Sequence, residues 1–148
     1  MCKKDGIRKL ITEADTRNWR KEMEQKSTLY IYRMRKKSIK EERYENNRES
    51  DIWFRAKTNC LDLCDKKRGE SNDCKICGEE KEDLTHFLLN CKKLNHVRVC
   101  SIILQKPHNR DITETIGDFF FNNEDIDKKK SLLYQMWLTR INIIKNSS

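Results

Sequence analysis

Three cysteines and one histidine lie close together in the middle of the sequence, and all four side chains are good zinc ligands. They are Cys74, Cys77, His86 and Cys91, in the pattern Cys-x2-Cys-x8-His-x4-Cys. Structural zinc prefers four thiolate or imidazole ligands in a tetrahedron. Two cysteines separated by two residues can hold an ion from one tight turn, and Gly78 after them can take the positive φ of that turn. The spacing predicts one structural zinc ion, without the open position that a catalytic site keeps for water.

The spacing of the second pair of ligands restricts the geometry of the helix on which they lie. Residues 84–90 have a helical pattern, and His86 and Cys91 are five residues apart. In a regular α-helix that offset is a rotation of roughly 500°, which leaves the two side chains roughly 140° apart. We therefore expect the helix to end or tighten near Asn90, with Cys91 at its C-terminal edge and the apolar residues 87–89 packed beneath the site.

Two alternatives to this ligand set remain open at the sequence level. Two further cysteines offer a rival set that leaves His86 and Cys91 without a role; it consists of Cys60, Cys64, Cys74 and Cys77. The four candidate ligands could also be scattered buried cysteines and one surface histidine. A disulfide framework is disfavoured, because the seven cysteines are odd in number and no export signal is visible.

The elements that position these residues are expected to be helices. The chain has 148 residues with only one proline and four glycines, and 38% of its residues are charged against 36% hydrophobic. This composition predicts an all-α domain with a thin core, built from about five or six helices. The Cys3His zinc knuckle is expected to stabilise it. We divide it into a basic helical arm, a zinc-knuckle region and a C-terminal helical hairpin packing on that region; these are 1–47, 48–100 and 101–148.

Apolar periodicity and capping signals indicate where the helices lie. Trp19 and Met23 share a face of the first, and the apolar stripe of the last makes 125–145 the clearest helix. Ser50 is the expected cap of a short third helix, and Asp111 to Glu114 have the spacing of a capping box. The expected helices are 12–26, 28–44, a short helix through 52–56, 84–90, a helix from 112 to about 121, and 125–145.

Positive charge is concentrated in the first half of the chain. The net charge is +8, and residues 1–70 carry 20 Lys and Arg against 13 Asp and Glu. A basic surface suggests a polyanion partner such as nucleic acid or an anionic membrane, although it can also serve solubility alone. No apolar run is long enough to cross a bilayer, and no secretory signal is visible. We expect an intracellular protein of the nucleus or cytoplasm, without a membrane partner.

Basic residues before and after the knuckle are the candidate nucleic-acid contacts. They are Arg33, Arg35, Lys36, Lys37, Lys40, Arg55, Lys57, Lys66, Lys67, Arg68, Lys75, Lys92 and Lys93. Trp53 and Phe54 lie among these residues; we expect them to pack in the core, and stacking on bases is the alternative. The loop 78–85 has a net charge of −3 and should repel phosphates.

Three segments together resemble a known protein family. They are Asp51-Ile-Trp-Phe-Arg-Ala-Lys-Thr-Asn-Cys-Leu61, the basic turn Asp65-Lys-Lys-Arg68, and the knuckle from Cys74 to Cys91. They resemble the C-terminal region of reverse transcriptases from non-LTR (LINE-type) retrotransposons, where an Arg-x-Arg-Thr-(Asn/Gly) segment precedes a Cys-Cys-His-Cys knuckle. The resemblance implies that Cys74, Cys77, His86 and Cys91 are the metal ligands and that Arg55, Lys57, Thr58 and Asn59 form the basic segment.

The same resemblance implies partners but no catalysis by this chain. In that family the knuckle region helps to hold element RNA or target DNA, so RNA or DNA and the polymerase body are the expected partners. The chain has no Asp-Asp pair of the kind that polymerases use for two-metal catalysis, and it has Lys57 where the family often has Arg. The predicted function is a non-catalytic zinc-knuckle nucleic-acid-binding module from such a reverse transcriptase. A zinc-stabilised protein-interaction module, docking through the face of 131–144 or the acidic loop, and an inert relic of a decayed element are the alternatives.

Overall fold

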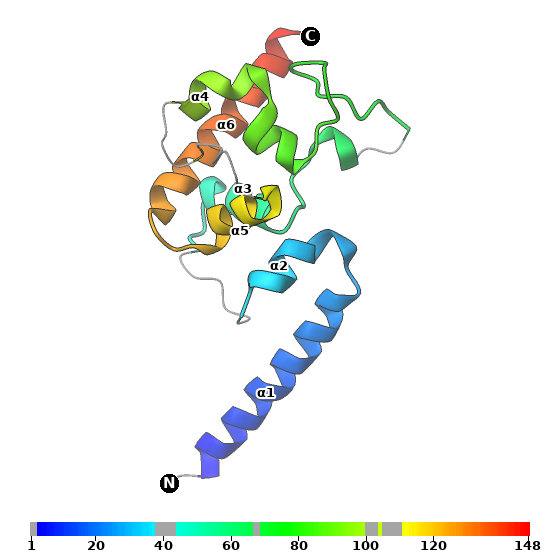
Figure 1. The fold of residues 1–148 in the computed structure, drawn as a ribbon. Helices are drawn as coiled ribbons and strands as arrows, with labels where there is room; N and C mark the ends of the chain where they lie inside the picture. Colours follow the sequence, from blue (N-terminus) through cyan, green and yellow to red (C-terminus); the bar gives the residue numbers. More distant parts are fainter. Residues whose placement is uncertain (1–2, 38–43, 67–68, 100–103, 105–110) are drawn as a thin grey trace. The chain divides into compact units, whose positions relative to one another are not determined.

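The fold is all-α, as the sequence predicts. A computed structural model describes residues 3–37, 44–66, 69–99, 104 and 111–148. Within these ranges every regular element is a helix, and the β pairing is limited to one isolated antiparallel bridge between Asp73 and Lys81. The chain divides into two compact units, Met1–Tyr44 and Glu45–Ser148 (Figure 1). Among the helices of the described ranges, none has both the length and the apolar character that a bilayer span requires.

The described part of the unit Met1–Tyr44, residues 3–37 and 44, contains one long α-helix and one short one. Helix α1 spans Lys3–Glu24, so it begins earlier than the predicted 12–26. A 3-10 turn, η1 (Ser27–Leu29), leads into α2, which spans only Tyr30–Arg35. The predicted helix 28–44 is therefore too long, because Lys36 already has extended backbone; residues 38–43 lie outside the described ranges. The guanidinium of Arg33 donates to the Glu24 carbonyl over 3.1 Å, which ties α2 to the end of α1.

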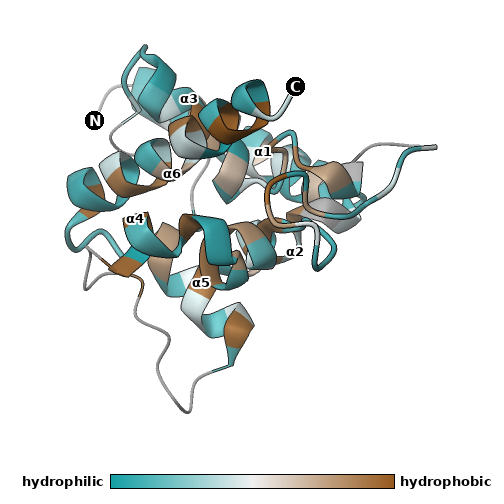
Figure 2. Ribbon diagram, turned by 90° about the horizontal axis from the view of Figure 1, so that it is seen from above, coloured by the Kyte–Doolittle hydropathy of each residue, from teal (hydrophilic) through white to brown (hydrophobic). Residues whose placement is uncertain are grey.

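The core of the unit Glu45–Ser148 forms where α3 (Arg48–Lys57), α5 (Ile112–Phe121) and α6 (Ile126–Asn146) meet. Trp53 of α3 is buried, and its ring centroid lies 5.4 Å from that of Phe119 and 4.9 Å from that of Phe120. The core-packing interpretation of Trp53 is thus confirmed, and the alternative, in which it stacks on bases, is wrong. Figure 2 shows apolar and polar residues alternating along α6, as expected for a helix with one buried face.

The start of α3 differs from the prediction in its capping residue. Asn47 is the N-cap, and its side chain accepts a hydrogen bond of 2.8 Å from the Ser50 backbone N–H. Ser50 lies within the helix and is buried, and its hydroxyl oxygen accepts from the Lys130 ammonium of α6 over 2.8 Å. Asp111 stands at the N-cap position of α5 without a side-chain cap hydrogen bond, so the predicted capping box does not form.

Helix α6 is close to its predicted bounds. It begins after Asp125, which has a left-handed backbone conformation with φ 54°. Leu133 and Met136 are fully buried, and α3 and α4 (Asn95–Val99) pack against this helix. The apolar face of 131–144 is therefore core around Leu133 and Met136, whereas its remaining members are only half-buried: Trp137, Ile141 and Ile144.

Candidate metal centre

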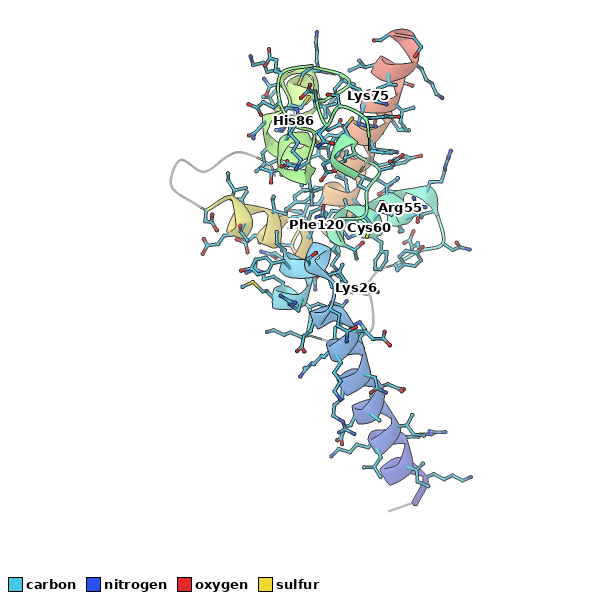
Figure 3. The ribbon with its side chains drawn as sticks, turned by 90° about the vertical axis from the view of Figure 1, so that its right-hand side faces the viewer. Lys26, Arg55, Cys60, Lys75, His86 and Phe120 are labelled. Carbon is cyan, nitrogen blue, oxygen red and sulfur yellow. The ribbon has the colours of Figure 1, made fainter. Side chains whose placement is uncertain are left out.

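Four ligand atoms converge in the unit Glu45–Ser148. One ligand atom from each of Cys74, Cys77, His86 and Cys91 lies within 4.8 Å of the other three. Cys74, His86 and Cys91 are buried, and Cys77 is half-buried. The predicted ligand set is thus brought together in space. Cys60 and Cys64 are not members of the cluster, so the rival set is wrong, and Figure 3 shows Cys60 well apart from His86.

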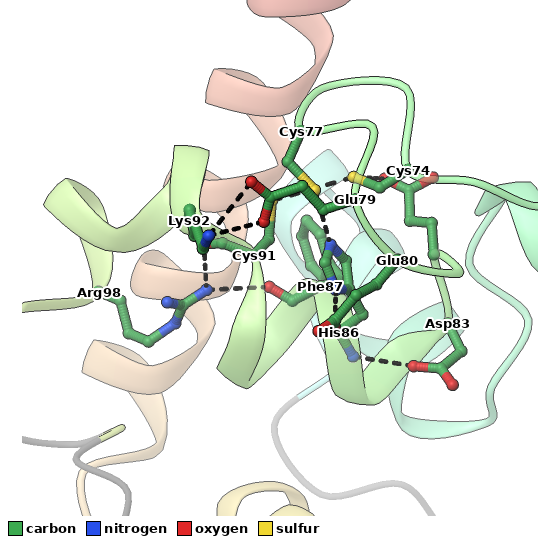
Figure 4. Close-up of polar contacts among 11 residues, drawn as sticks. Cys74, Cys77, Glu79, Glu80, Asp83, His86, Phe87, Cys91, Lys92 and Arg98 are labelled. Carbon is green, nitrogen blue, oxygen red and sulfur yellow. Dashed lines mark hydrogen bonds and ion pairs between the residues drawn. The ribbon is translucent and has the colours of Figure 1, made fainter.

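The first pair of ligands comes from a closed turn. The Gly78 N–H donates to the Cys74 carbonyl over 2.8 Å, and Gly78 has φ 71°, as expected from the spacing. The loop around the turn is closed by backbone hydrogen bonds from Cys74 N to Glu80 O, 2.8 Å, and from Glu82 N to Asn72 O, 2.9 Å. These bonds hold the sulfur atoms of Cys74 and Cys77 on the same side of the loop (Figure 4).

The second pair of ligands comes from a π-helical turn. The element η3 (His86–Asn90) is π-helical, and the Cys91 N–H donates to the His86 carbonyl over 2.8 Å, five residues back. The expected end near Asn90 is confirmed, but the helix widens there instead of tightening. A wider turn brings residue i+5 back toward the side of residue i, and π-helical bulges are frequent at functional sites. This turn is what lets His86 and Cys91 face one point.

Arg98 closes the C-terminal end of the π-helical turn. Its buried guanidinium donates to the carbonyl oxygens of Leu88, 2.7 Å, Phe87, 3.4 Å, and Cys91, 3.2 Å. The last carbonyls of a helix have no hydrogen-bond donor within the helix. The Arg98 side chain supplies donors to the carbonyls at the end of this turn. Arg98 could not be singled out from the sequence, because nothing local marks it as different from the exposed basic residues.

Two of the separations among the ligand atoms are close to those around a tetrahedral zinc ion. The sulfur atoms of Cys74 and Cys91 lie 3.9 Å apart, and the Cys77 sulfur lies 3.3 Å from His86 Nε2. With Zn–S bonds of about 2.3 Å and a Zn–N bond of about 2.0 Å, a tetrahedron places two sulfurs about 3.8 Å apart and a sulfur and a nitrogen about 3.5 Å apart. The four residues could therefore hold one metal ion, and three sulfurs with one imidazole are a set that zinc favours.

The imidazole of His86 is oriented by an acidic neighbour. Its Nδ1 lies 3.0 Å from Oε2 of Glu80, and its backbone N–H donates to the Asp83 carboxylate over 2.8 Å. A carboxylate on Nδ1 favours the tautomer that carries its proton there and leaves Nε2 free as a metal ligand. The line from Glu80 through the ring to Cys77 is visible in Figure 4.

Burial favours the protonated form of two of the candidate ligand thiols. Burial raises the pKa of the Cys74 thiol and that of the Cys91 thiol well above the ordinary value. A metal ion must displace these protons, because the thiolate is the form that coordinates it. The centre is thus suited to a cation whose binding free energy exceeds the cost of deprotonating the thiols, and zinc is such a cation.

A buried ion pair lies beside the ligands. The Glu82 carboxylate is fully buried and accepts hydrogen bonds of 2.7 Å from both Nε and Nη2 of Arg140. Burial raises the pKa of Glu82, but hydrogen bonds from Arg140 and Cys64 more than offset it and lower the pKa to about 2. In the sequence Glu82 stands only in a loop expected to repel phosphates, and its pairing could not be predicted because its partner is 58 residues away.

The acidic loop of the knuckle is occupied by internal contacts. Glu79 pairs with Lys92 at 2.8 Å, Glu80 with His86, and Glu82 with Arg140. The loop is therefore built into the centre, which gives no support to its predicted use as a docking surface.

Most of the predicted nucleic-acid contacts in the described ranges have intramolecular contacts of their own. Arg55 pairs with Asp51 at 3.1 Å, Lys75 with Glu70 at 3.8 Å, and the Lys57 ammonium lies 4.8 Å from the Phe121 ring centroid. Figure 3 labels Arg55 and Lys75 at the surface of this unit. The exposed candidates in the described ranges are Arg35, Lys37, Arg55, Lys75, Lys92 and Lys93. Those outside the described ranges are Lys40, Lys67 and Arg68, together with the side chain of Lys66.

Comparisons with known proteins leave the chain without an assigned relative: no protein-family model, no curated protein and no solved structure matches it.

Proposed function

We propose that this protein is a non-catalytic nucleic-acid-binding module whose unit Glu45–Ser148 is held together by one structural zinc ion. The observation that carries the proposal is the convergence of four ligand atoms within 4.8 Å. All four positions of a zinc tetrahedron are supplied by the protein, which is the arrangement of structural sites rather than catalytic ones.

In this proposal the zinc ion cross-links two segments of the chain. It joins the turn of Cys74 and Cys77 to the π-helical turn of His86 and Cys91, two segments with little regular structure between them. A unit with a thin apolar core gains a large share of its stability from such a link. Cys74, Cys77, His86 and Cys91 would hold the ion, and the surrounding backbone keeps them in position.

The charge distribution supports a polyanion as the partner and Met1–Tyr44 as the unit that contacts it. That unit has fourteen Lys and Arg against seven Asp and Glu, a net charge of +7, whereas Glu45–Ser148 has a net charge of only +1. The stretch from Lys26 to Lys37 contains five basic residues and no acidic one. Tyr30 is 52% exposed within this stretch and offers a ring for base stacking.

The resemblance to non-LTR retrotransposon reverse transcriptases supports RNA or target DNA as that polyanion. It also supports derivation from such an enzyme and an interaction with its polymerase body. The internal pairing of Arg55, Lys75 and Lys92 favours a supporting role for the knuckle, with the basic segment of the first unit making the phosphate contacts.

The zinc part of the proposal is tested by elemental analysis of protein purified without added metal. We expect about one zinc ion per chain, lost together with helical circular dichroism in Cys77→Ser. Cys60→Ser is the matched control, because Cys60 is an exposed cysteine outside the cluster, and it should keep both signals. Protein without zinc that keeps its full helical signal would exclude a structural metal.

The nucleic-acid part is tested by fluorescence anisotropy with short single-stranded RNA and DNA across a series of salt concentrations. A variant with glutamine in place of Arg33, Arg35, Lys36 and Lys37 should bind more weakly, and the slope of log K against log salt should shrink by roughly 0.7 for each phosphate that the protein no longer neutralises. The matched control replaces Arg55, Lys75, Lys92 and Lys93 and should have a smaller effect. Absence of binding by the zinc-loaded wild type at low salt, or binding independent of salt, contradicts this part.

A further inference from the structure

The Glu82 carboxylate connects a metal ligand to helix α6. One oxygen, Oε1, accepts from Arg140 Nε over 2.7 Å and lies 3.6 Å from the sulfur of Cys74. The other oxygen, Oε2, accepts from Arg140 Nη2 over 2.7 Å and from the Cys64 backbone N–H over 3.1 Å. The carboxylate is fully buried, so no solvent screens it from either neighbour. A ligand sulfur and the α6 guanidinium therefore share one buried anion.

The same stretch of α6 also contacts the other half of the centre. Arg140 is buried, and its guanidinium carbon lies 5.1 Å from the ring centroid of Trp137. The Trp137 ring meets the Phe87 ring edge-on at 6.1 Å between centroids, and Phe87 directly follows the ligand His86 in the π-helical turn. One turn of α6 thus reaches the Cys74 side through charge and the His86 side through aromatic packing.

The charges around the centre require the guanidinium. A Zn²⁺ ion with three thiolates and a neutral imidazole has a net charge of −1. A carboxylate 3.6 Å from one of the thiolates adds a second negative charge at short range. Inside a protein two such charges repel strongly unless a cation lies against them, and Arg140 is the cation whose contacts with Glu82 are bidentate. Without Arg140, binding the metal would place a thiolate beside an uncompensated carboxylate.

We propose that Arg140, acting through Glu82, is a positioning residue of the metal centre. Metal binding and the packing of α6 against the centre therefore depend on one another. The inference rests on the zinc site proposed above and adds how that site is regulated within the fold. Coupling of this kind is reciprocal. Bound metal stabilises the packing of α6 against the centre, and loss of that packing lowers the affinity for the metal.

The test uses cobalt(II) as the probe metal, because its absorption reports thiolate coordination directly. Affinity is measured for the full chain by competition with a chelator in three variants: Arg140→Met, Glu82→Gln and the double variant. Arg140→Met should lower the affinity roughly 10–100-fold, the range typical of residues that support ligands. Glu82→Gln should have a smaller effect, because it removes the repelling charge. The double variant should bind more tightly than Arg140→Met alone.

This order of affinities separates positioning from simple packing. If α6 merely needed its ion pair to fold, both single variants and the double variant would lose affinity and helical signal together, and that result would overturn the proposal. Equal affinities in all three variants would overturn it as well. The double variant keeps the experiment decisive, because a buried pair removed as a pair is often tolerated where one unpaired charge is not.

Two further measurements complete the test. The exposed pair of Arg55 and Asp51 is the matched control; Arg55→Met, Asp51→Asn and their double variant should leave cobalt affinity unchanged. Hydrogen exchange should show that metal slows exchange of the α6 amides around Arg140 in the wild type and does so less in the double variant. Wild-type protein that develops no thiolate–cobalt absorption would refute the proposed zinc site itself, whereas wild-type binding with unaffected variants would refute the coupling alone.

Discussion

The imidazole of His86 lies between two functional groups: Nδ1 is 3.0 Å from Glu80 Oε2, and Nε2 is 3.3 Å from the Cys77 sulfur. One ring nitrogen is thus directed to a carboxylate, and the other is directed into the cluster. This relationship leaves Nε2 as the nitrogen that would bind a metal ion, and it makes an exposed acidic residue part of the centre.

Removal of the Glu80 side chain should therefore weaken metal binding. We expect Glu80→Ala to lower zinc affinity by about tenfold, the lower end of the range for such neighbours, because Glu80 is 62% exposed and water can replace part of its hydrogen bond. The measurement is competition with a zinc-binding dye. Glu70→Ala is the control, since Glu70 is an equally exposed carboxylate paired with Lys75. Equal affinities in the two variants would contradict the role of Glu80.

Metal affinity should rise with pH. Burial raises the pKa of the Cys74 and Cys91 thiols, so both are protonated near neutrality without metal, and zinc must displace both protons. The stabilisation by zinc is therefore present at high pH and is lost as pH falls. We expect apparent affinity to increase by at least about two log units per pH unit near pH 7, one for each of these two thiols, measured by zinc competition at several pH values. Cys91→Ser should reduce this dependence by about one proton, and a wild-type affinity independent of pH would contradict the prediction.

The two helix starts of the larger unit should respond differently to the loss of their capping residues. Asn47→Ala removes a side chain that accepts from the Ser50 N–H at 2.8 Å and should lower the free energy of unfolding by about 1 kcal/mol. Asp111→Ala removes a side chain without a cap hydrogen bond and should have a smaller effect. Urea unfolding of the zinc-loaded protein measures both, and a larger loss in Asp111→Ala would show that the assigned caps are wrong.

The aromatic cluster should be the most sensitive part of the apolar core. Phe120 is buried and lies between Trp53, with ring centroids 4.9 Å apart, and Phe119, 5.0 Å apart. Phe120→Ala should lower the free energy of unfolding by about 3–5 kcal/mol and change the tryptophan fluorescence. Ile112→Ala on the same helix is the control, because Ile112 is 41% exposed. Comparable losses at the two positions would argue against this core.

Several features were accessible from the sequence because local chain geometry decides them. The ligand set of Cys74, Cys77, His86 and Cys91 could be predicted because short spacings restrict how far apart side chains can lie. The span of α6 could be predicted because its apolar periodicity acts within one helix. The positive φ of Gly78 followed from the tight turn for the same reason. The early end of α2 could not be predicted, since a basic segment with few breaking residues has no strong local signal for a stop.

The tertiary structure decided how distant residues are paired. Glu82 and Arg140 are 58 residues apart, Ser50 and Lys130 are 80 apart, and neither pairing leaves a pattern in the local sequence. The sequence by itself determined an all-α chain with four metal-ligand candidates and a basic first unit. Only the folded chain decided that the ligands meet through a π-helical turn and that a buried guanidinium of α6 neutralises the carboxylate beside them. The physical reason is that spacing and periodicity act over a few residues, whereas burial and charge pairing depend on which segments come together in space.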